Sequence, residues 1–174
     1  MNGHGRFLTL ELVDGANPGS IAETFAQGIH LKVVGRRDQD VAAGHAAYDV
    51  LYMHDARNLF DQATAMGGQT WGVAEAASAL IAQGKIRKTI IVGIDNTQAR
   101  SREYMPAGVY RALNPEDQAT LSNAMKGPPL SDAYLKFIVA ELKPYIDRTY
   151  KTQKGPDHTF IMGSSMGGLI SLYA

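Results

Sequence analysis

The sequence predicts an α/β fold, a doubly wound and mostly parallel sheet with helices on both faces. The first observation is that short apolar stretches alternate along the chain with stretches of helical periodicity, which is typical of parallel strands joined by right-handed crossovers. The second is that the stretch 48–53 is apolar on both faces beyond Asp49, as an interior parallel strand should be. The chain has 174 residues, enough for one domain with a sizeable core.

The individual elements are predicted from apolar runs and from the residues that stop them. The expected strands are 7–13, Ile29–Val34, 48–53, Thr89–Ile94 and 160–162. The expected helices are 71–83, a short helix that begins at Asn114, and 131–150. Pro115 suits the first position of the short helix, whereas Pro144 should kink the long one. Apart from the second strand, residues 16–47 have no clear pattern.

Composition and charge exclude several classes of function. The 17 Lys and Arg residues balance the 17 Asp and Glu residues, so the net charge does not favour binding to nucleic acid or to an anionic membrane. Cysteine is absent, which excludes disulfides and thiolate metal sites and fits a reducing cytoplasm. No apolar run is long enough to cross a bilayer, and the N-terminus lacks the pattern of a signal peptide. We therefore expect a cytoplasmic protein that needs no cofactor.

The most informative stretch is Gly163-Ser164-Ser165-Met166-Gly167, which fits the G-x-S-x-G pattern of a nucleophile elbow. It follows a short apolar strand and precedes a segment that can start a helix, and this is the context that the pattern requires. Two other interpretations are a glycine-rich turn without chemistry and a phosphate cradle at a helix N-terminus. A Walker loop is excluded because no lysine follows the glycines. The strand and helix context favours a nucleophilic Ser165.

Four stretches together resemble the putative-esterase family of α/β hydrolases, which includes feruloyl esterases, siderophore esterases and S-formylglutathione hydrolase. They are Val-Leu-Tyr-Met-His-Asp-Ala-Arg-Asn-Leu-Phe-Asp at 50–61, Trp-Gly-Val at 71–73 with its helix, Val-Gly-Ile-Asp-Asn at 92–96 with Arg-Glu-Tyr-Met-Pro at 102–106, and 137–150 leading to the elbow. The resemblance covers residues 48–174, whereas 14–47 match poorly.

The resemblance implies a hydrolase of small carboxylic esters and gives roles to particular residues. Ser165 matches the nucleophile. The oxyanion hole would use the backbone N–H of Met166 and a second N–H from the loop after Met53, at Ala56 or Arg57. These groups would meet at the carboxyl edge of the sheet, where ligands bind in open α/β folds.

The sequence departs from the family after the elbow. In the family the acid and then the histidine follow the serine, but no Asp, Glu or His follows Ser165. We therefore expect a single α/β-hydrolase-like domain over 1–174 that lacks the usual C-terminal strands, acid and histidine. His54 is the one histidine that the fold should bring near the catalytic edge, and a structural role is favoured for it over that of a base. Asp55 is expected to hold the oxyanion loop, and His54-Asp55 lacks the further ligands of a metal site.

These observations give two main hypotheses. The first is a serine-dependent ester hydrolase that is weak or depends on a base from another subunit. The second is a catalytically inactive remnant of the fold that binds or oligomerises, and a third, weaker one is an anion-binding module. The strand 160–162 should be an apolar edge, so we also expect a homodimer or a higher closed oligomer built on residues 158–174.

Overall fold

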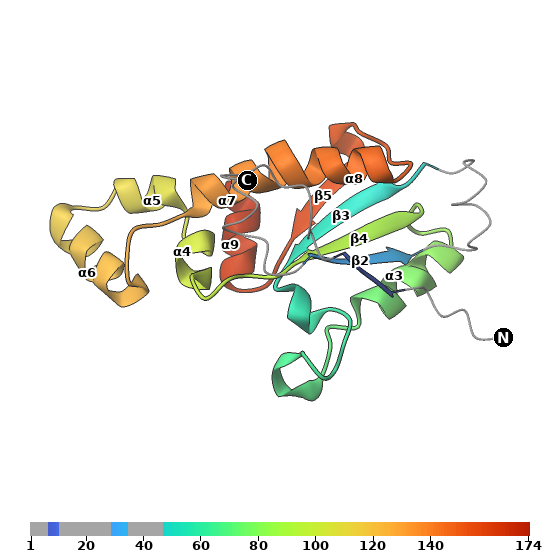
Figure 1. The fold of residues 1–174 in the computed structure, drawn as a ribbon, viewed down its shortest axis with the longest axis horizontal. Helices are drawn as coiled ribbons and strands as arrows, with labels where there is room; N and C mark the ends of the chain where they lie inside the picture. The colour runs from blue at the N-terminus through green and yellow to red at the C-terminus, as the bar shows by residue number, and fades with distance from the viewer. Residues whose placement is uncertain (1–6, 11–28, 35–46) are drawn as a thin grey trace.

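The computed structural model describes residues 7–10, 29–34 and 47–174 (Figure 1). A five-stranded sheet runs in the order β1-β2-β4-β3-β5. The strands are β1 (Phe7–Leu10), β2 (Ile29–Val34), β3 (Asp49–His54), β4 (Thr89–Ile94) and β5 (Thr159–Met162). The predicted α/β class is confirmed. Residues 11–28 and 35–46 lie outside the described residues. They include most of the weakly patterned segment 16–47 and the last three residues of the expected strand 7–13.

The strands that carry the site are parallel to one another, whereas the first two strands of the sheet pair in antiparallel fashion. β3 pairs in parallel with both β4 and β5, whereas β2 runs antiparallel to β1 and to β4. Parallel neighbours need a crossover of a dozen or more residues, usually a helix, and antiparallel ones do not. The absence of a clear helical pattern in the sequence between 7 and 48 agrees with the antiparallel arrangement there.

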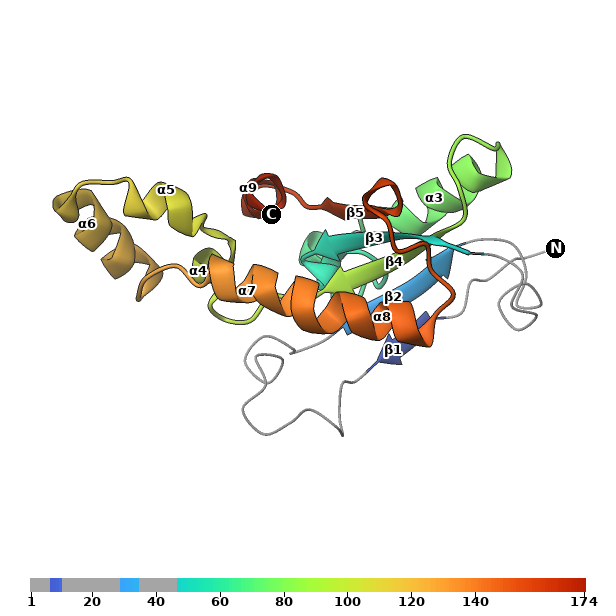
Figure 2. The ribbon, with the colours of Figure 1, turned by 90° about the horizontal axis from the view of Figure 1, so that it is seen from above.

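Helices cover both faces of the sheet (Figure 2). They are α3 (Val73–Ala82), α4 (Arg100–Tyr104), α5 (Ala107–Arg111), α6 (Pro115–Met125), α7 (Ser131–Phe137), α8 (Lys143–Thr149) and α9 (Met166–Tyr173), with short turns η1 (Ala56–Asn58), η2 (Met66–Gly68) and η4 (Pro156–His158). A π-helical turn, η3 (Ile138–Leu142), joins α7 to α8. It stands directly before Lys143 and Pro144, where the missing proline N–H interrupts the ladder. α5 and α6 form an arm that extends away from the sheet (Figure 1).

Successive side chains of the central strands enter two separate cores. Tyr52 and Val92 belong to the core under α7, α8 and α9, whereas Met53 and Ile91 belong to the core under α3. All four side chains are at most 3% exposed. Burial on both faces is the reason that these strands have no polar alternation. The cores fix β3 and β4 firmly, and the loops at their carboxyl ends build the site.

Candidate active site

Ser165 occupies the strained turn between β5 and α9. Its backbone has φ 55° and ψ −121°, a conformation that non-glycine residues rarely adopt. The turn is tight, because a Cβ on Gly163 would lie 2.6 Å from the carbonyl carbon of Gly167. Only glycine fits at that position. This geometry exposes Ser165 at the end of the strand, as the nucleophile-elbow pattern predicts.

The first turn of α9 leaves a backbone donor beside Ser165. The N–H groups of Gly167 and Gly168 donate to the carbonyl oxygens of Ser164 and Ser165, at 2.8 and 3.0 Å. Within the part of the chain that the structure describes, no acceptor is recorded for the Met166 N–H. The N–H groups of a first helical turn have no partner within the helix, and they carry its positive end.

Both residues predicted as alternatives for the second donor lie in the loop after β3. Met53 pairs with Met162 in the parallel register, so the loops after β3 and β5 leave the same edge of the sheet. The Arg57 N–H donates to Asp95 Oδ1 at 2.8 Å and is therefore occupied. The Ala56 N–H has no recorded acceptor among the described residues. Of the two predicted alternatives, the geometry favours Ala56.

His54 is enclosed beneath the elbow. Its side chain is fully buried, its Nδ1 lies 2.7 Å from the Tyr134 hydroxyl, and its ring lies against those of Tyr104 and Tyr134 with centroids 5.1 and 5.6 Å away. Burial lowers the pKa of His54 to about 4. The Nε2 atom has no hydrogen-bond partner among the described residues. A neutral, enclosed imidazole of this kind suits the structural role better than that of a base.

Asp55 is bound by an arginine. Arg100 donates from Nε to Oδ1 at 2.6 Å and from Nη2 to Oδ2 at 2.9 Å, and the Asp55 side chain is only 6% exposed. The sequence indicates this pair only weakly, because 45 positions separate its members. The neighbouring Glu103 is buried and accepts hydrogen bonds from Thr97, while Arg102 donates to the Pro128 carbonyl. Glu103 and Arg102 therefore clamp loops and do not form an ion pair with each other.

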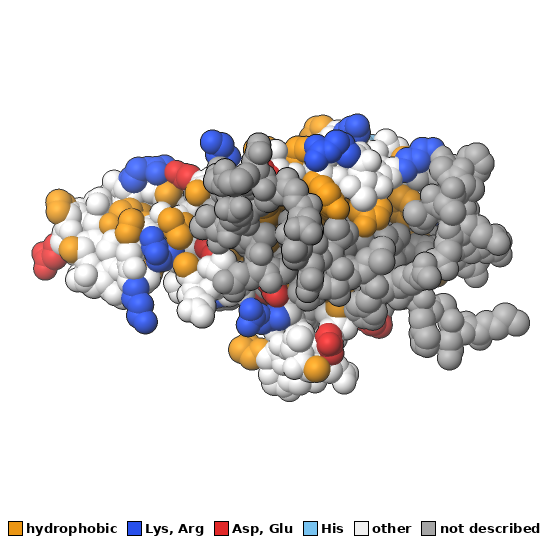
Figure 3. All heavy atoms as spheres, viewed as in Figure 1, with side chains coloured by type: hydrophobic (Ala, Val, Ile, Leu, Met, Phe, Trp, Pro, Cys, Tyr) orange, Lys and Arg blue, Asp and Glu red, His pale blue; other side chains and the backbone are white. Residues whose placement is uncertain are grey.

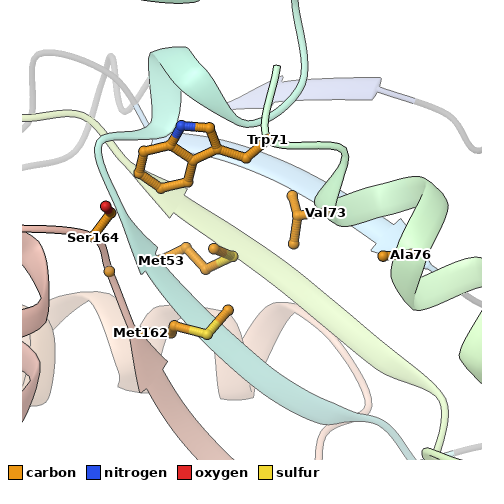
Figure 4. Close-up of a pocket in the computed structure, with 7 residues that line it drawn as sticks. Met53, Trp71, Val73, Ala76, Met162 and Ser164 are labelled. Carbon is orange, nitrogen blue, oxygen red and sulfur yellow. The ribbon is translucent and has the colours of Figure 1, made fainter. Parts of the chain in front are cut away.

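An apolar pocket of about 350 Å³ borders the elbow. It is lined by Met53, Trp71, Val73, Ala76, Met162, Gly163 and Ser164. Figure 4 shows Trp71 on one side and Met53 and Met162 on the other, with Ser164 at one end. The pocket has no local signal in the sequence, because it brings together side chains from β3, from α3 and the residues before it, and from β5.

The described residues give no sign of a metal site or a membrane span. They contain no group of three His, Cys, Asp or Glu side chains that is placed to hold a metal ion. None of the helices among them is long and apolar enough to cross a bilayer. On the face that Figure 3 shows, basic and acidic side chains are interspersed, in agreement with the balanced charge.

The fold is similar to those of several solved esterases and hydrolases. An IroE-like serine hydrolase from Shewanella oneidensis is 27% identical over 82% of this chain and 39% of that one, with a TM-score of 0.56. The BES protein of Bacillus cereus is 20% identical over 82% of this chain and 50% of that one, with a TM-score of 0.55. The siderophore hydrolase EstB of Aspergillus nidulans is 16% identical over 100% of this chain and 52% of that one, with a TM-score of 0.54.

The chain thus spans between 39% and 52% of the length of these solved structures. A comparison with curated protein sequences gave no match. The family model described as "Putative esterase" matches residues 38–174, which include the β3 loop, α4 and the elbow. The match confirms the resemblance carried by the four sequence stretches. The chain belongs to the Putative esterase family.

Proposed function

We propose that the protein hydrolyses carboxylic esters with Ser165 as the nucleophile. The observation that carries this proposal is the strained, exposed Ser165 between β5 and α9. Strain at a non-glycine residue persists only where the surrounding structure enforces it, and such residues cluster at functional sites. The family and the likeness to a serine hydrolase support the same chemistry.

The oxyanion hole uses the N–H groups of Met166 and Ala56. Attack by the Ser165 hydroxyl on the ester carbonyl forms a tetrahedral intermediate, and its oxygen takes up the negative charge. Two N–H groups that are fixed before the reaction stabilise this charge without reorganising. Removing one such donor typically lowers kcat by about 10²–10³-fold.

The general base comes from outside the described residues or from another subunit. His54 is buried against Tyr104 and Tyr134, and His158 bonds Asp49 at the start of β3. Serine proteases that lack triad members keep about 10³–10⁴-fold catalysis over water. Without such a base, turnover at Ser165 is therefore weak, and a base supplied in trans raises its rate.

The substrate is a small ester with an apolar acyl or alcohol group. The apolar pocket adjoins the elbow at Gly163 and Ser164, and the side chains of Met53, Trp71 and Met162 form its walls. Burial of apolar area stabilises binding by about 25 cal/mol per Å². Butyrate and hexanoate p-nitrophenyl esters are expected to react faster than the acetate.

The second candidate function is a non-catalytic binding or oligomerising module. The exposure of two large apolar side chains on β5 favours it: Phe160 and Met162 are 44% and 45% exposed. An anion bound at the start of α9 is a third and weaker candidate. Thermal stabilisation by phosphate tests that third candidate directly.

A fluorophosphonate probe separates the esterase from the module. We expect stoichiometric labelling of the wild type and none of Ser165→Ala. Ser171→Ala is the matched control, because Ser171 lies in α9 and its hydroxyl donates to the Gly167 carbonyl. An unlabelled wild type, or labelling that survives in Ser165→Ala, contradicts the proposal.

A further inference from the structure

We propose that Arg100 is a positioning residue that holds Asp55 and thereby directs the Ala56 N–H toward the oxyanion of the substrate. The inference rests on the proposed function. Arg100 does not touch the reacting atoms. It acts through the backbone of the loop that follows β3, and α4 thus becomes part of the esterase machinery.

The Asp55 backbone needs an external restraint. Asp55 has φ 59° and ψ 48°, in the left-handed region that costs an L-residue free energy. It directly precedes Ala56, so its ψ angle sets the direction of the Ala56 N–H. A residue in this region stays there only when its surroundings determine its conformation. The restraint on Asp55 is therefore a restraint on the predicted donor.

α4 holds Asp55 at both its side chain and its backbone. Arg100 donates two parallel hydrogen bonds to the carboxylate, at 2.6 and 2.9 Å, and the Tyr104 hydroxyl accepts from the Asp55 N–H at 3.3 Å. The Arg100 guanidinium lies over the Tyr104 ring, 4.9 Å from its centroid. Paired arginine–carboxylate bonds fix orientation as well as position. One short helix therefore sets the geometry of Asp55.

Contacts of Arg57 and of the elbow also hold the loop around Ala56 in place. Asp95 accepts the Arg57 N–H at 2.8 Å, so the residues on both sides of Ala56 are held. A Cβ on Gly167 would lie 3.4 Å from Asp55 Oδ2 and 3.3 Å from the Cβ of His54. The restrained loop thus packs directly on the first turn of α9, next to Met166. Movement of Asp55 separates the two predicted donors.

The chain offers a matched ion pair for comparison. Arg87 donates to Asp49 Oδ2 at 2.7 Å, and the Asp49 side chain is 7% exposed, against 6% for Asp55. Both acids belong to β3 or its flank, but Asp49 begins the strand, whereas Asp55 follows its carboxyl end. Arg87 is more exposed than Arg100, at 60% against 33%, and gives Asp49 one hydrogen bond, so Arg87→Ala removes a weaker arginine–carboxylate contact far from the elbow.

The test measures phosphonylation of Ser165 by a fluorophosphonate, with its rate constant and its half-saturating concentration determined separately. We expect Arg100→Ala to lower the rate constant by about 10-fold or more, up to the roughly 10²–10³-fold that complete loss of one oxyanion donor costs, because the donor is displaced and not removed. The half-saturating concentration stays the same, since Arg100 does not contact the probe. Free guanidinium restores part of the rate in Arg100→Ala, and Arg100→Lys falls between the two. Arg87→Ala reacts like the wild type.

A double variant and an exchange measurement sharpen the result. Arg100→Ala with Asp55→Asn removes the charge of the unpaired acid, and we expect it to remain slow because the restraint is still missing. Recovery to the wild-type rate overturns the positioning role, as does an equal loss in Arg100→Ala and Arg87→Ala. Amide exchange at Asp55 and Arg57, whose N–H groups donate to the Tyr104 hydroxyl and to Asp95, should rise in Arg100→Ala and not in Arg87→Ala. This readout needs no reactive serine, so an unlabelled wild type refutes the proposed function and leaves the positioning role testable; unchanged exchange overturns it.

Discussion

Ser165 keeps its turn only because Gly163 lets the strand end approach the helix. A Cβ on Gly163 would lie 2.6 Å from backbone atoms of Gly167, and a backbone cannot move aside as a flexible side chain does. Gly163→Ala is therefore expected to lower the free energy of unfolding by about 1–3 kcal/mol, the usual cost of overpacking. It should also reduce labelling of Ser165. Urea denaturation and the fluorophosphonate assay measure the two effects.

Gly168→Ala is the control for this substitution. Its Cβ would lie 3.4 Å from the Gly163 carbonyl oxygen, close to an ordinary contact distance, and the position is inside α9. Alanine replaces glycine in a helix interior with a gain of about 0.5–1 kcal/mol. We expect unchanged or higher stability. Similar losses in both variants would show that the helix, and not the close approach at Gly163, limits the turn.

The burial of His54 makes stability depend on pH. The pKa of His54 is about 4 in the folded chain, below the value of roughly 6.5 in the unfolded chain. The unfolded state therefore binds the proton more readily, and the stabilisation present above about pH 6.5 is lost as the pH falls toward 4. Between about pH 7 and 5 the wild type should lose about 2 kcal/mol through this group. Urea unfolding at both pH values measures the loss.

His54→Gln is the comparison, since an amide can still bond the Tyr134 hydroxyl and does not titrate in this range. Its stability should change less between the two pH values. The rate of Ser165 phosphonylation should show no step that disappears in His54→Gln. A kinetic step near neutral pH that the substitution removes would identify His54 as the base.

Some of these residues can be predicted from the sequence because they belong to a local pattern. Others cannot, because their contacts join residues that are far apart in the chain. Ser165 and Met166 belong to a local pattern of strand, turn and helix, so consecutive residues carry the information. The contact between His54 and Tyr134 joins residues 80 positions apart, and no local periodicity encodes it. The same is true of Arg100 and Asp55.

The observed bounds of helices and strands agree with the predicted ones where a single pattern of burial runs through the whole element. β4 has the predicted bounds, Thr89–Ile94, because all six residues are buried. The predicted helix 71–83 forms as Val73–Ala82, and the segment 131–150 forms as α7, η3 and α8. In both helical segments the apolar stripe faces a single core. The direction of β2 was less predictable, because an isolated apolar strand looks alike whether its neighbours run parallel or antiparallel.

The arm of α5 and α6 shows that a helix can be well predicted from its sequence and still bury none of its residues against the rest of the fold. Asn114 caps α6 as predicted, accepting from the Asp117 N–H at 2.9 Å. The helix, however, has no buried residue. Its formation follows from the cap and from local propensity, whereas α4, only five residues long, is fixed by contacts with Asp55 and Thr97. The functional importance of an element thus depends on its contacts and not on its length.

The molecule as a whole exposes apolar side chains around β5 and α9. Phe160, Met162, Leu169 and Leu172 are 44%, 45%, 50% and 89% exposed. Among the described strands β5 has one neighbour, β3, and none of the described strands pairs with its other edge. Proteins rarely leave an apolar edge strand open to solvent. The proposal of a homodimer, or a higher closed oligomer, built on residues 158–174 follows from this surface.

A two-fold axis beside β5 brings the same strand of two copies together, because a C2 interface pairs a patch with itself. We expect light scattering at micromolar concentration to give twice the chain mass of 18.8 kDa, or a higher closed multiple. Phe160→Lys should shift the species toward monomer, since it places a charge within the interface. Val139→Lys is the control: Val139 is 66% exposed, but it lies in η3 and outside the proposed contact.

Mixed oligomers test whether the interface also completes the site. Ser165→Ala subunits keep every histidine, and subunits with substituted histidines keep the serine. If a partner's base reaches Ser165 across the two-fold axis, mixing the two inactive proteins restores part of the esterase activity. If the mixture stays inactive while the wild type turns over esters, the base is not shared between subunits. A monodisperse wild-type monomer in light scattering would contradict the proposed interface. It would also exclude the supply of a base to Ser165 by a second copy of the chain.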